Sequence, residues 1–570
     1  MSTPRPGLFI GVLLLVTLLF PLESPAASDL PDSMLEEILD VYAGNIYRRG
    51  ETTGLAAAIT LNGRTVFKSY GFTSASAPSP ANAITKNSIF EIGSVTKIWT
   101  TVLAGQATSS PAESLLGLYT SLGSLSGPLP GIQPALAPAT LGDLASFTAG
   151  LPDVGSTGGK GNRPPIAEWG VSDFVEAISE LSPLNYNVKP PASTTLPAPY
   201  FYSDWSTGLL GLLVTNPLDS PLPEDAVNNW EQAIRQSIAS PLGMTDTYVF
   251  APEGGQADRV VKGYNQATGE AFVSGGRLTS IKLNTQGGNY ASAPAVTISD
   301  LSGSGASAVA VMEGSGADQR VSQIRVTNPG SGYHPGPGVV FGGPGSWAEG
   351  QPIVVGGYIV GVQITKGGRN YQSGKPPSVT FRSANQRGEG ASGTAIVSNG
   401  AVVAVHMTSG GSGYPSRPVV HIAPGTNTVN VVPVWAAAGA IKSSASDLIK
   451  LCQLYLGRPE IDGNPVEPTL SLGARTALTP LILNSQSNPN GFTGMAWNVS
   501  TGDIEGGLNM QFGKDGGLTG FASYVSLVPS INLGVVILRS NNAAKAAYAD
   551  PIGTVAQGIC RQVQLELMVP

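Results

Sequence analysis

The stretch FEIGSVTKIWT, Phe90–Thr100, holds a serine and a lysine three positions apart, Ser94 and Lys97. If the segment begins a helix, positions i and i+3 lie on one face, so the hydroxyl and the ammonium are neighbours. A serine becomes a nucleophile when an adjacent base takes its proton, and a lysine serves as that base when its surroundings lower its pKa. The same spacing also occurs at an ordinary solvated helix start, so the rest of the chain has to decide.

Histidine is confined to one part of the chain. All three histidines fall in a single glycine-rich region: His334, His406 and His421. The other segments contain none, so they cannot build a Ser-His-Asp triad or a His-ligated zinc site by themselves. Both cysteines lie in helix-like segments, which argues against a Cys-His nucleophile. Ser94 with Lys97 is then the natural nucleophile and base, and we expect neither a cofactor nor a metal.

The N-terminus contains an apolar run, LFIGVLLLVTLLF, after Arg5 and before the small residues SPAAS. This order predicts a secretory signal peptide, residues 1–26, and therefore a secreted, extracellular protein. The run is shorter than the roughly 20 residues that span a bilayer, so no transmembrane segment is expected. An oxidising compartment permits a disulfide between Cys452 and Cys560, while two separate buried thiols are an equal alternative.

The composition limits the classes of partner and fold. A chain of 570 residues predicts two or three domains. Charged residues make up 12%, against roughly a quarter in a typical soluble protein, and the net charge is −7. No basic face is expected, so nucleic acid is an unsuitable partner.

Local patterns near both termini predict one α/β (α+β) domain. DSMLEEILDVYAGNIYR, residues 32–48, has the periodicity of an amphipathic helix. LAAAITLNGRTVFKSYGF, residues 55–72, alternates around Asn62-Gly63 and predicts a β-hairpin. YVSLVPSINLGVVILRSN, residues 524–541, predicts two more strands, followed by a C-terminal helix. Strands at both ends suggest a sheet that joins the two termini.

A repeat of glycine-rich β segments interrupts that domain. QGGNY, PGSGY, GGRNY and GGSGY recur about every 40 residues, each between an alternating strand and a Pro-containing turn with another strand. Their last residues are Tyr290, Tyr333, Tyr371 and Tyr414. We expect a small all-β domain of three to four units at 276–432, inserted between 27–275 and 433–570. Its form, prism- or barrel-like or solenoid, stays open. It is a candidate lid, oligomerisation element, or contact for glycans or a cell surface.

FEIGSVTK resembles the nucleophile motif of the serine β-lactamase and penicillin-binding-protein superfamily, specifically its class C β-lactamase-like branch. LASFTAGLPD, residues 144–153, is similar to another of its motifs, with Phe147 where histidine is common. PLGMTDT, residues 241–247, and GAIKSSASDL, residues 439–448, resemble further signatures. The resemblance covers roughly 30–275 and 433–570. It implies a β-lactamase/transpeptidase-like fold, with an antiparallel sheet flanked by helices plus a helical subdomain.

Two more motifs complete the site that the resemblance implies. FYSDWSTGLLG is similar to the family's Y-x-N element, which makes Tyr202 the second proton-transfer residue and places Asp204 where asparagine is usual. FGKDGGLTGF resembles the K-T-G or H-x-G element. The implied substrate-binding residues are Asp204, Lys514 and Gly516. The N–H groups of Ser94 and Gly517 are the implied oxyanion donors.

The resemblance implies a serine hydrolase that forms an acyl-enzyme on an amide or ester of a small molecule or peptide. D-amino peptides, β-lactam-like compounds and esters all fit, and Lys514 would attract a substrate carboxylate. An ion pair of Asp204 with Lys97 would shift the proton-accepting role toward Tyr202. The alternatives are a carboxylesterase or acyltransferase without lactamase activity, and a catalytically inactive binding protein that uses the repeats.

Overall fold

The computed structural model describes most of the chain but not the predicted signal peptide, which lies outside the described residues. The described residues are 29–48, 52–74, 78–109, 116–153, 169–179, 200–249, 254–263, 267–286, 290, 292–299, 303–315, 319–333, 337–341, 346–355, 357–369, 376–383, 388–398, 401–414, 419–422, 433–483, 491–501, 510–518, 520–541 and 551–568.

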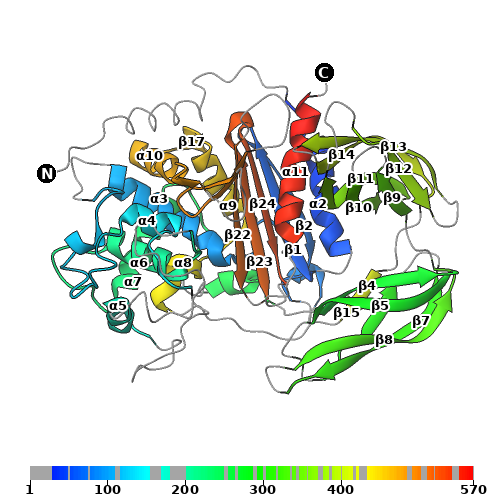
Figure 1. The fold of residues 1–570 in the computed structure, drawn as a ribbon, viewed down its shortest axis with the longest axis horizontal. Coiled ribbons are helices and arrows are strands. Elements are labelled where there is room, and N and C mark those ends of the chain that lie inside the picture. Colours follow the sequence, from blue (N-terminus) through cyan, green and yellow to red (C-terminus); the bar gives the residue numbers. More distant parts are fainter. Residues whose placement is uncertain are drawn as a thin grey trace.

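An antiparallel sheet of eight strands, counted over the described residues, forms the centre of the molecule (Figure 1). Helices α2 and α11 cover one face, and α9 packs on the other. The strand order is β19 (Ile482–Leu483), β20 (Gly491–Thr493), β21 (Asn498–Thr501), β22 (Met510–Leu518), β23 (Phe521–Val528), β24 (Leu533–Arg539), β1 (Gly54–Leu61) and β2 (Arg64–Gly71). The covering helices are α2 (Asp32–Arg48), α9 (Ala445–Tyr455) and α11 (Pro551–Met568).

The sheet joins the two ends of the chain, as the sequence predicted. Strands β1 and β2 form a hairpin whose turn residues, Asn62 and Gly63, have φ angles of 52° and 86°. This positive-φ pair is the reason for the Asn-Gly signal in the sequence. Strand β1 also pairs with β24 in antiparallel register, and every residue of β1 is buried because helices cover both faces.

A helical subdomain lies on the α9 side of the sheet (Figure 1). Its core includes the buried indole rings of Trp99, Trp205 and Trp230. The helices are α3 (Thr96–Ser109), α4 (Leu141–Ser146), α5 (Val171–Ser179), α6 (Asp204–Thr215), α7 (Ala226–Ala233), α8 (Ala436–Gly439) and α10 (Pro468–Ala477). Two short strand pairs accompany them: β3 (Phe90–Glu91) with β16 (Lys442–Ser443), and β17 (Glu460–Ile461) with β18 (Asn464–Pro465).

The repeat region contains four hairpins in its described part, each followed by a short strand. The hairpins are β4 (Ala267–Ser274) with β5 (Arg277–Gln286), β7 (Ser304–Glu313) with β8 (Arg320–Ser331), β10 (Ser346–Val355) with β11 (Tyr358–Arg369), and β13 (Glu389–Ser398) with β14 (Ala401–Ser412). The short strands are β6 (Val296–Ser299), β9 (Pro337–Phe341), β12 (Val379–Ser383) and β15 (Val419–Ile422). Because β4 pairs with β5, the strand pairing favours an insert that begins ahead of residue 276.

Two of the repeated tyrosines, Tyr333 and Tyr414, close equivalent loops, and Tyr371 lies outside the described residues. Tyr333 Oη accepts a hydrogen bond from the Ala306 N–H at 3.1 Å, and Tyr414 Oη accepts one from the Ala391 N–H at 3.3 Å. Long-range pairs complete the two lobes seen in Figure 1, since β15 pairs with β6 of the first unit and β12 pairs with β9. The repeats therefore form two lobes. The first lobe contains β4–β8 and β15, and the second lobe contains β9–β14.

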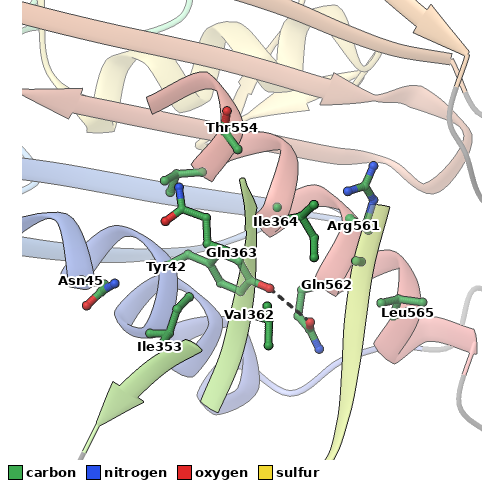
Figure 2. Close-up of a pocket in the computed structure, with 13 residues that line it drawn as sticks. Tyr42, Asn45, Ile353, Val362, Gln363, Ile364, Thr554, Arg561, Gln562 and Leu565 are labelled. Carbon is green, nitrogen blue, oxygen red and sulfur yellow. Dashed lines mark hydrogen bonds between the residues drawn. The ribbon is translucent and has the colours of Figure 1, made fainter. Parts of the chain in front are cut away.

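The second lobe packs against α2 and α11 and encloses a small cavity (Figure 2). Its volume is about 50 Å³, which suits a few water molecules rather than a substrate. Tyr42 lies in its wall and donates a hydrogen bond to Gln562 Oε1 at 3.4 Å. Burial raises the pKa of Tyr42 to about 12. The cavity is thus a packing gap behind the sheet, formed with elements other than those that carry the predicted nucleophile.

Both cysteines lie in helices, as predicted, and both are buried free thiols. Cys452 of α9 belongs to the core between the sheet and the helical subdomain. Cys560 of α11 belongs to the core on the other face. The alternative of separate thiols is therefore the one observed. None of the helices that the structure describes is long and apolar enough to cross a membrane.

Candidate active site

A tight turn between β3 and α3 presents Ser94. Gly93 adopts φ +50°, which starts a short 3₁₀ turn, Gly93–Val95, and α3 follows directly. Backbone pairing fixes the strand ahead of the turn, because β3 pairs with β16 and the Ile92 N–H donates to the Ile441 carbonyl at 3.1 Å. The Ser94 side chain is consequently partly exposed at the beginning of a buried helix. The predicted helix start, with Ser94 and Lys97 on one face, is present.

Lys97 is completely buried, and its ammonium has an acceptor for each of its three protons. Lys97 Nζ donates to Ser94 Oγ at 3.1 Å and to the Ala438 carbonyl at 2.8 Å, and it forms an ion pair with Asp204 Oδ1. An ammonium has three donors and no acceptor, so these three contacts satisfy it fully. The geometry thus places a fully hydrogen-bonded Lys97 side chain next to Ser94.

Tyr202 is the second side chain in contact with the Ser94 hydroxyl. The Tyr202 and Ser94 oxygens are 2.5 Å apart, and either of them can be the donor. The ring packs against Phe147, with ring centroids 5.1 Å apart. Phe147 sits at φ +62° at the end of α4, where the Phe201 N–H donates to its carbonyl. Burial, with the nearby Asp204 and Asp515 charges as smaller causes, raises the pKa of Tyr202 well above its ordinary value, so the resting side chain is a neutral phenol.

Asp204 is the first residue of α6, which Ser203 caps by accepting from the Ser206 N–H at 3.0 Å. The carboxylate reaches both partners of Ser94. Asp204 Oδ1 accepts from Lys97 Nζ and, at 3.4 Å, from the Tyr202 hydroxyl. The predicted ion pair of Asp204 with Lys97 is therefore present, and the same oxygen also bonds the tyrosine.

Strand β22 brings a second lysine to the site. The Lys514 side chain is buried, and its Nζ lies 5.3 Å from the centre of the Tyr202 ring. It forms an ion pair with Asp515 Oδ1 at 3.0 Å. The Lys514 charge is the main cause that lowers the pKa of Asp515, and Lys97 adds to it. Lys514 is thus already paired inside the protein.

Two glycines allow β22 to lie directly against the nucleophile turn. A Cβ on Gly516 would stand 2.0 Å from the Ile92 carbonyl oxygen, so no other residue fits there. A Cβ on Gly93 would stand 3.0 Å from the Gly517 nitrogen, which places that nitrogen beside the turn. The predicted oxyanion role of the Gly517 N–H stays a prediction. Gly516 contacts the turn, and its predicted contact with substrate stays a prediction.

Sequence reasoning missed the Ala438 carbonyl as the third acceptor of Lys97. A backbone oxygen has no residue-type signal, although it immediately precedes the conspicuous GAIKSSASDL segment. Sequence reasoning also noted Phe147 only as a departure from a motif, whereas the Phe147 ring packs against the Tyr202 ring.

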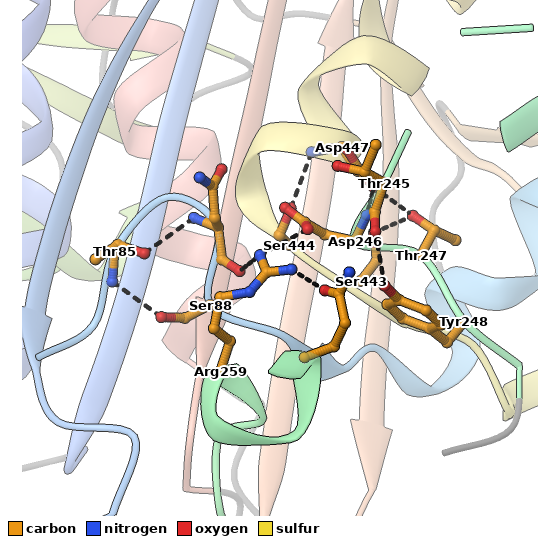
Figure 3. A network of polar contacts seen from close by, with 12 residues as sticks. Thr85, Ser88, Thr245, Asp246, Thr247, Tyr248, Arg259, Ser443, Ser444 and Asp447 are labelled. Carbon is orange, nitrogen blue, oxygen red and sulfur yellow. Dashed lines mark hydrogen bonds and ion pairs between the residues drawn. The ribbon is translucent and has the colours of Figure 1, made fainter. Parts of the chain in front are cut away.

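A polar network connects segments that are far apart in the sequence (Figure 3). It joins the PLGMTDT and GAIKSSASDL segments, because Asp447 Oδ2 accepts from the Asp246 N–H at 2.7 Å and from the Thr247 hydroxyl at 2.9 Å. Arg259 Nη1 pairs with Asp246 Oδ1 at 2.6 Å. Burial raises the pKa of Asp447 to about 6. These contacts hold the segment that supplies β16 and the Ala438 carbonyl.

Comparisons with known proteins show what the chain as a whole is similar to. The family model described as Beta-lactamase matches residues 33–352. A beta-lactamase from Pseudomonas fluorescens is 26% identical over 249 residues, which are 43% of this chain and 59% of that protein's length.

Solved structures share the fold. One is a class C beta-lactamase in complex with cefoxitin, with 14% identity, coverage of 94% of this chain and 100% of that chain, and a TM-score of 0.51. Another is a beta-lactamase from Sulfitobacter sp. EE-36, with 17% identity, coverage of 94% and 99%, and a TM-score of 0.52. A beta-lactamase/D-alanine carboxypeptidase from Pseudomonas syringae has 15% identity, coverage of 93% and 99%, and a TM-score of 0.50. The predicted fold is confirmed.

Proposed function

The chain belongs to the beta-lactamase family, and on that premise we propose that it is a secreted serine hydrolase that cleaves an amide or ester through an acyl-enzyme on Ser94. The observation that carries the proposal is the pair of contacts on Ser94 Oγ. Lys97 Nζ lies at 3.1 Å and Tyr202 Oη at 2.5 Å, so both lie within hydrogen-bonding reach of the hydroxyl, as a nucleophile and its base require.

The first step is a proton relay with Asp204 at its end. Tyr202 donates its own proton toward Asp204 Oδ1, which leaves its oxygen lone pair to accept the Ser94 proton. As Ser94 Oγ bonds the substrate carbonyl carbon, the serine proton moves to Tyr202 and the tyrosine proton to Asp204. Because the raised pKa of Tyr202 disfavours a free phenolate, Tyr202 acts only as a relay. The buried Lys97 ammonium stabilises the developing alkoxide.

The second step returns the proton. The Ser94 and Gly517 N–H groups hold the oxyanion at the beginning of α3, where the helix dipole also favours negative charge. When the tetrahedral intermediate collapses, the relay runs backwards and Tyr202 protonates the leaving amine or alkoxide. Water then attacks the acyl-enzyme and releases the acid.

The substrate is a small molecule or peptide. The relatives are named as beta-lactamases, and one as a D-alanine carboxypeptidase, so β-lactams and D-amino peptides are the first candidates. Asp204 offers no amide N–H₂ to a substrate carbonyl, which argues for simpler amides and esters over efficient β-lactam turnover.

Covalent labelling tests the proposal. A fluorophosphonate probe should label the wild-type protein and fail to label Ser94→Ala, while Ser124→Ala, an exposed serine on a 3₁₀ turn, should label normally. Equal labelling of Ser94→Ala would contradict the assignment of the nucleophile. Secretion is tested separately, by N-terminal sequencing of the protein recovered from the medium, which should begin close to residue 27.

A further inference from the structure

The charges around Ser94 are paired with one another. Lys97 is paired with Asp204, and Lys514 is paired with Asp515. Each lysine of the site is buried, and each has its own carboxylate. A substrate carboxylate that approached Lys514 would therefore meet an ammonium already neutralised, together with a second negative charge beside it.

The two members of the outer pair differ in accessibility. The Lys514 side chain is 3% exposed, whereas the Asp515 side chain is 63% exposed. A bound molecule consequently reaches the carboxylate far more easily than the ammonium. A carboxylate has about four lone-pair positions, so Asp515 can keep its bond to Lys514 and accept further hydrogen bonds.

Asp515 also adjoins residues of the site, and its charge is one of those that raise the pKa of Tyr202. Asp515 directly precedes Gly516 and Gly517, which contact the nucleophile turn, and its partner Lys514 lies over the Tyr202 ring. A substrate whose carbonyl oxygen sits between the Ser94 and Gly517 N–H groups runs past this residue. The groups next to the scissile bond then come within reach of the exposed carboxylate.

Resting on the proposed function, we infer that Asp515 determines specificity, and that the enzyme takes acyl donors with an ammonium group beside the scissile amide or ester. Aminoacyl amides and esters with a free amino group are the class with this chemistry. Donors with a carboxylate in that position are rejected by like charge. The K-D-G-G sequence thereby replaces the preference for a substrate carboxylate, which an unpaired lysine would give, with a preference for a substrate ammonium.

Three substrates that differ only in the group on the α-nitrogen, and so in its charge, test the inference. They are the p-nitroanilide of D-alanine, which carries an ammonium, its neutral N-acetyl derivative and its acidic N-succinyl derivative. The wild type should show kcat/KM in the order ammonium, neutral, acidic. Asp515→Asn and Asp515→Thr should each lower the ratio of ammonium to acidic substrate by on the order of tenfold to a hundredfold, because they remove one charge and release Lys514.

Asp32→Asn is the matched control, since Asp32 is similarly exposed, at 57%, and is also ion-paired, to Arg64 on the α2 face. It should leave the ratio unchanged. The same charge order should appear without turnover, in the inhibition constants of boronic acids that carry the three N-terminal groups. A ratio that stays the same in both Asp515 variants, while they still label with fluorophosphonate, overturns the role of Asp515 and leaves the serine mechanism standing. Absence of labelling that depends on Ser94 overturns the proposed function and this inference with it.

Discussion

Replacing Asp204 with asparagine keeps the size of the side chain and removes its charge from a buried lysine. Two unit charges in contact, about 3 Å apart, attract by roughly 5 kcal/mol at an effective dielectric constant of about 20. Asp204 is 25% exposed, and the amide oxygen of asparagine still accepts a hydrogen bond, so the loss is smaller. We expect Asp204→Asn to lower the free energy of unfolding by about 3 kcal/mol, as for a buried pair broken from one side.

The same substitution removes the final proton acceptor of the relay. Asparagine cannot take the Tyr202 proton, so the Ser94 proton has no destination through that route. A positioned general base contributes roughly 10²–10⁴-fold, and acylation by p-nitrophenyl acetate should slow within that range. The rate is measured as the burst phase in stopped flow, which separates acylation from later hydrolysis.

Two comparisons make the result decisive. Formate should partly restore acylation in Asp204→Ala, because a small carboxylate fills the space and supplies the base, and chloride should not. Asp32→Asn breaks an exposed pair and should cost no more than about 1 kcal/mol in urea unfolding. If Asp204→Asn unfolds within about 0.5 kcal/mol of the wild type and acylates within tenfold of it, Asp204 is neither the charge partner nor the acceptor described above.

Three further outcomes follow from the geometry. Gly516→Ala should abolish Ser94 labelling and cost about 3 kcal/mol in urea unfolding, because its Cβ would stand 2.0 Å from the Ile92 carbonyl oxygen, whereas Gly117→Ala, with 3.8 Å of room, should label normally. Burial raises the pKa of Asp447 from 3.8 to about 6, so its protonated form stabilises the fold at low pH and this stability is lost as pH rises through about 6. Relative to Asp447→Asn, the free energy of unfolding of the wild type should fall by on the order of 3 kcal/mol between pH 4 and 7. The same pH dependence in both proteins would contradict this. Tyr414→Phe removes a hydrogen bond to the β13 backbone. It should lower the free energy of opening of the β13–β14 hairpin by about 1 kcal/mol, which is measured as faster amide hydrogen exchange there, with the β7–β8 hairpin unaffected.

Local patterns account for the parts of the fold that the sequence predicts well. The helix at 32–48 and the hairpin at Asn62-Gly63 depend on neighbouring residues, so periodicity and turn chemistry suffice to find them. The Tyr-ending repeats likewise predict the strand before each motif and the strand after it, which are β5, β8, β11 and β14, and β6, β9, β12 and β15. Which short strands close the lobes was not predictable, because β15 pairs with β6 across more than a hundred residues and neither strand encodes its partner.

The candidate site likewise contains contacts that the sequence predicts and contacts that it does not. The resemblance of three motifs brings Ser94, Lys97, Tyr202 and Lys514 to one place, and the structure has them there. The pairing of Lys514 with its own neighbour Asp515 is a matter of side-chain geometry at a strand edge, which spacing does not reveal. This contact is the basis of the specificity inferred above, since a lysine expected to attract carboxylates is already paired inside the protein.

The position of the repeats explains how a core enzyme fold tolerates so large an interruption. The chain leaves toward β4 just after the Val261 N–H has bonded the Ile89 carbonyl at 2.8 Å, and it returns at β16, which pairs with β3. Both ends of the insert therefore bond to one continuous segment, Ile89–Glu91, immediately ahead of the nucleophile turn. Since Tyr248 and Lys442 also exchange backbone hydrogen bonds at 2.8 and 2.7 Å, the two flanks are held together without help from the repeats. Loop-closure entropy grows only slowly with loop length, so a long insert between two fixed ends costs the core little. The same hydrogen bonds connect the segments that flank the repeats to β3, the strand that positions Ser94.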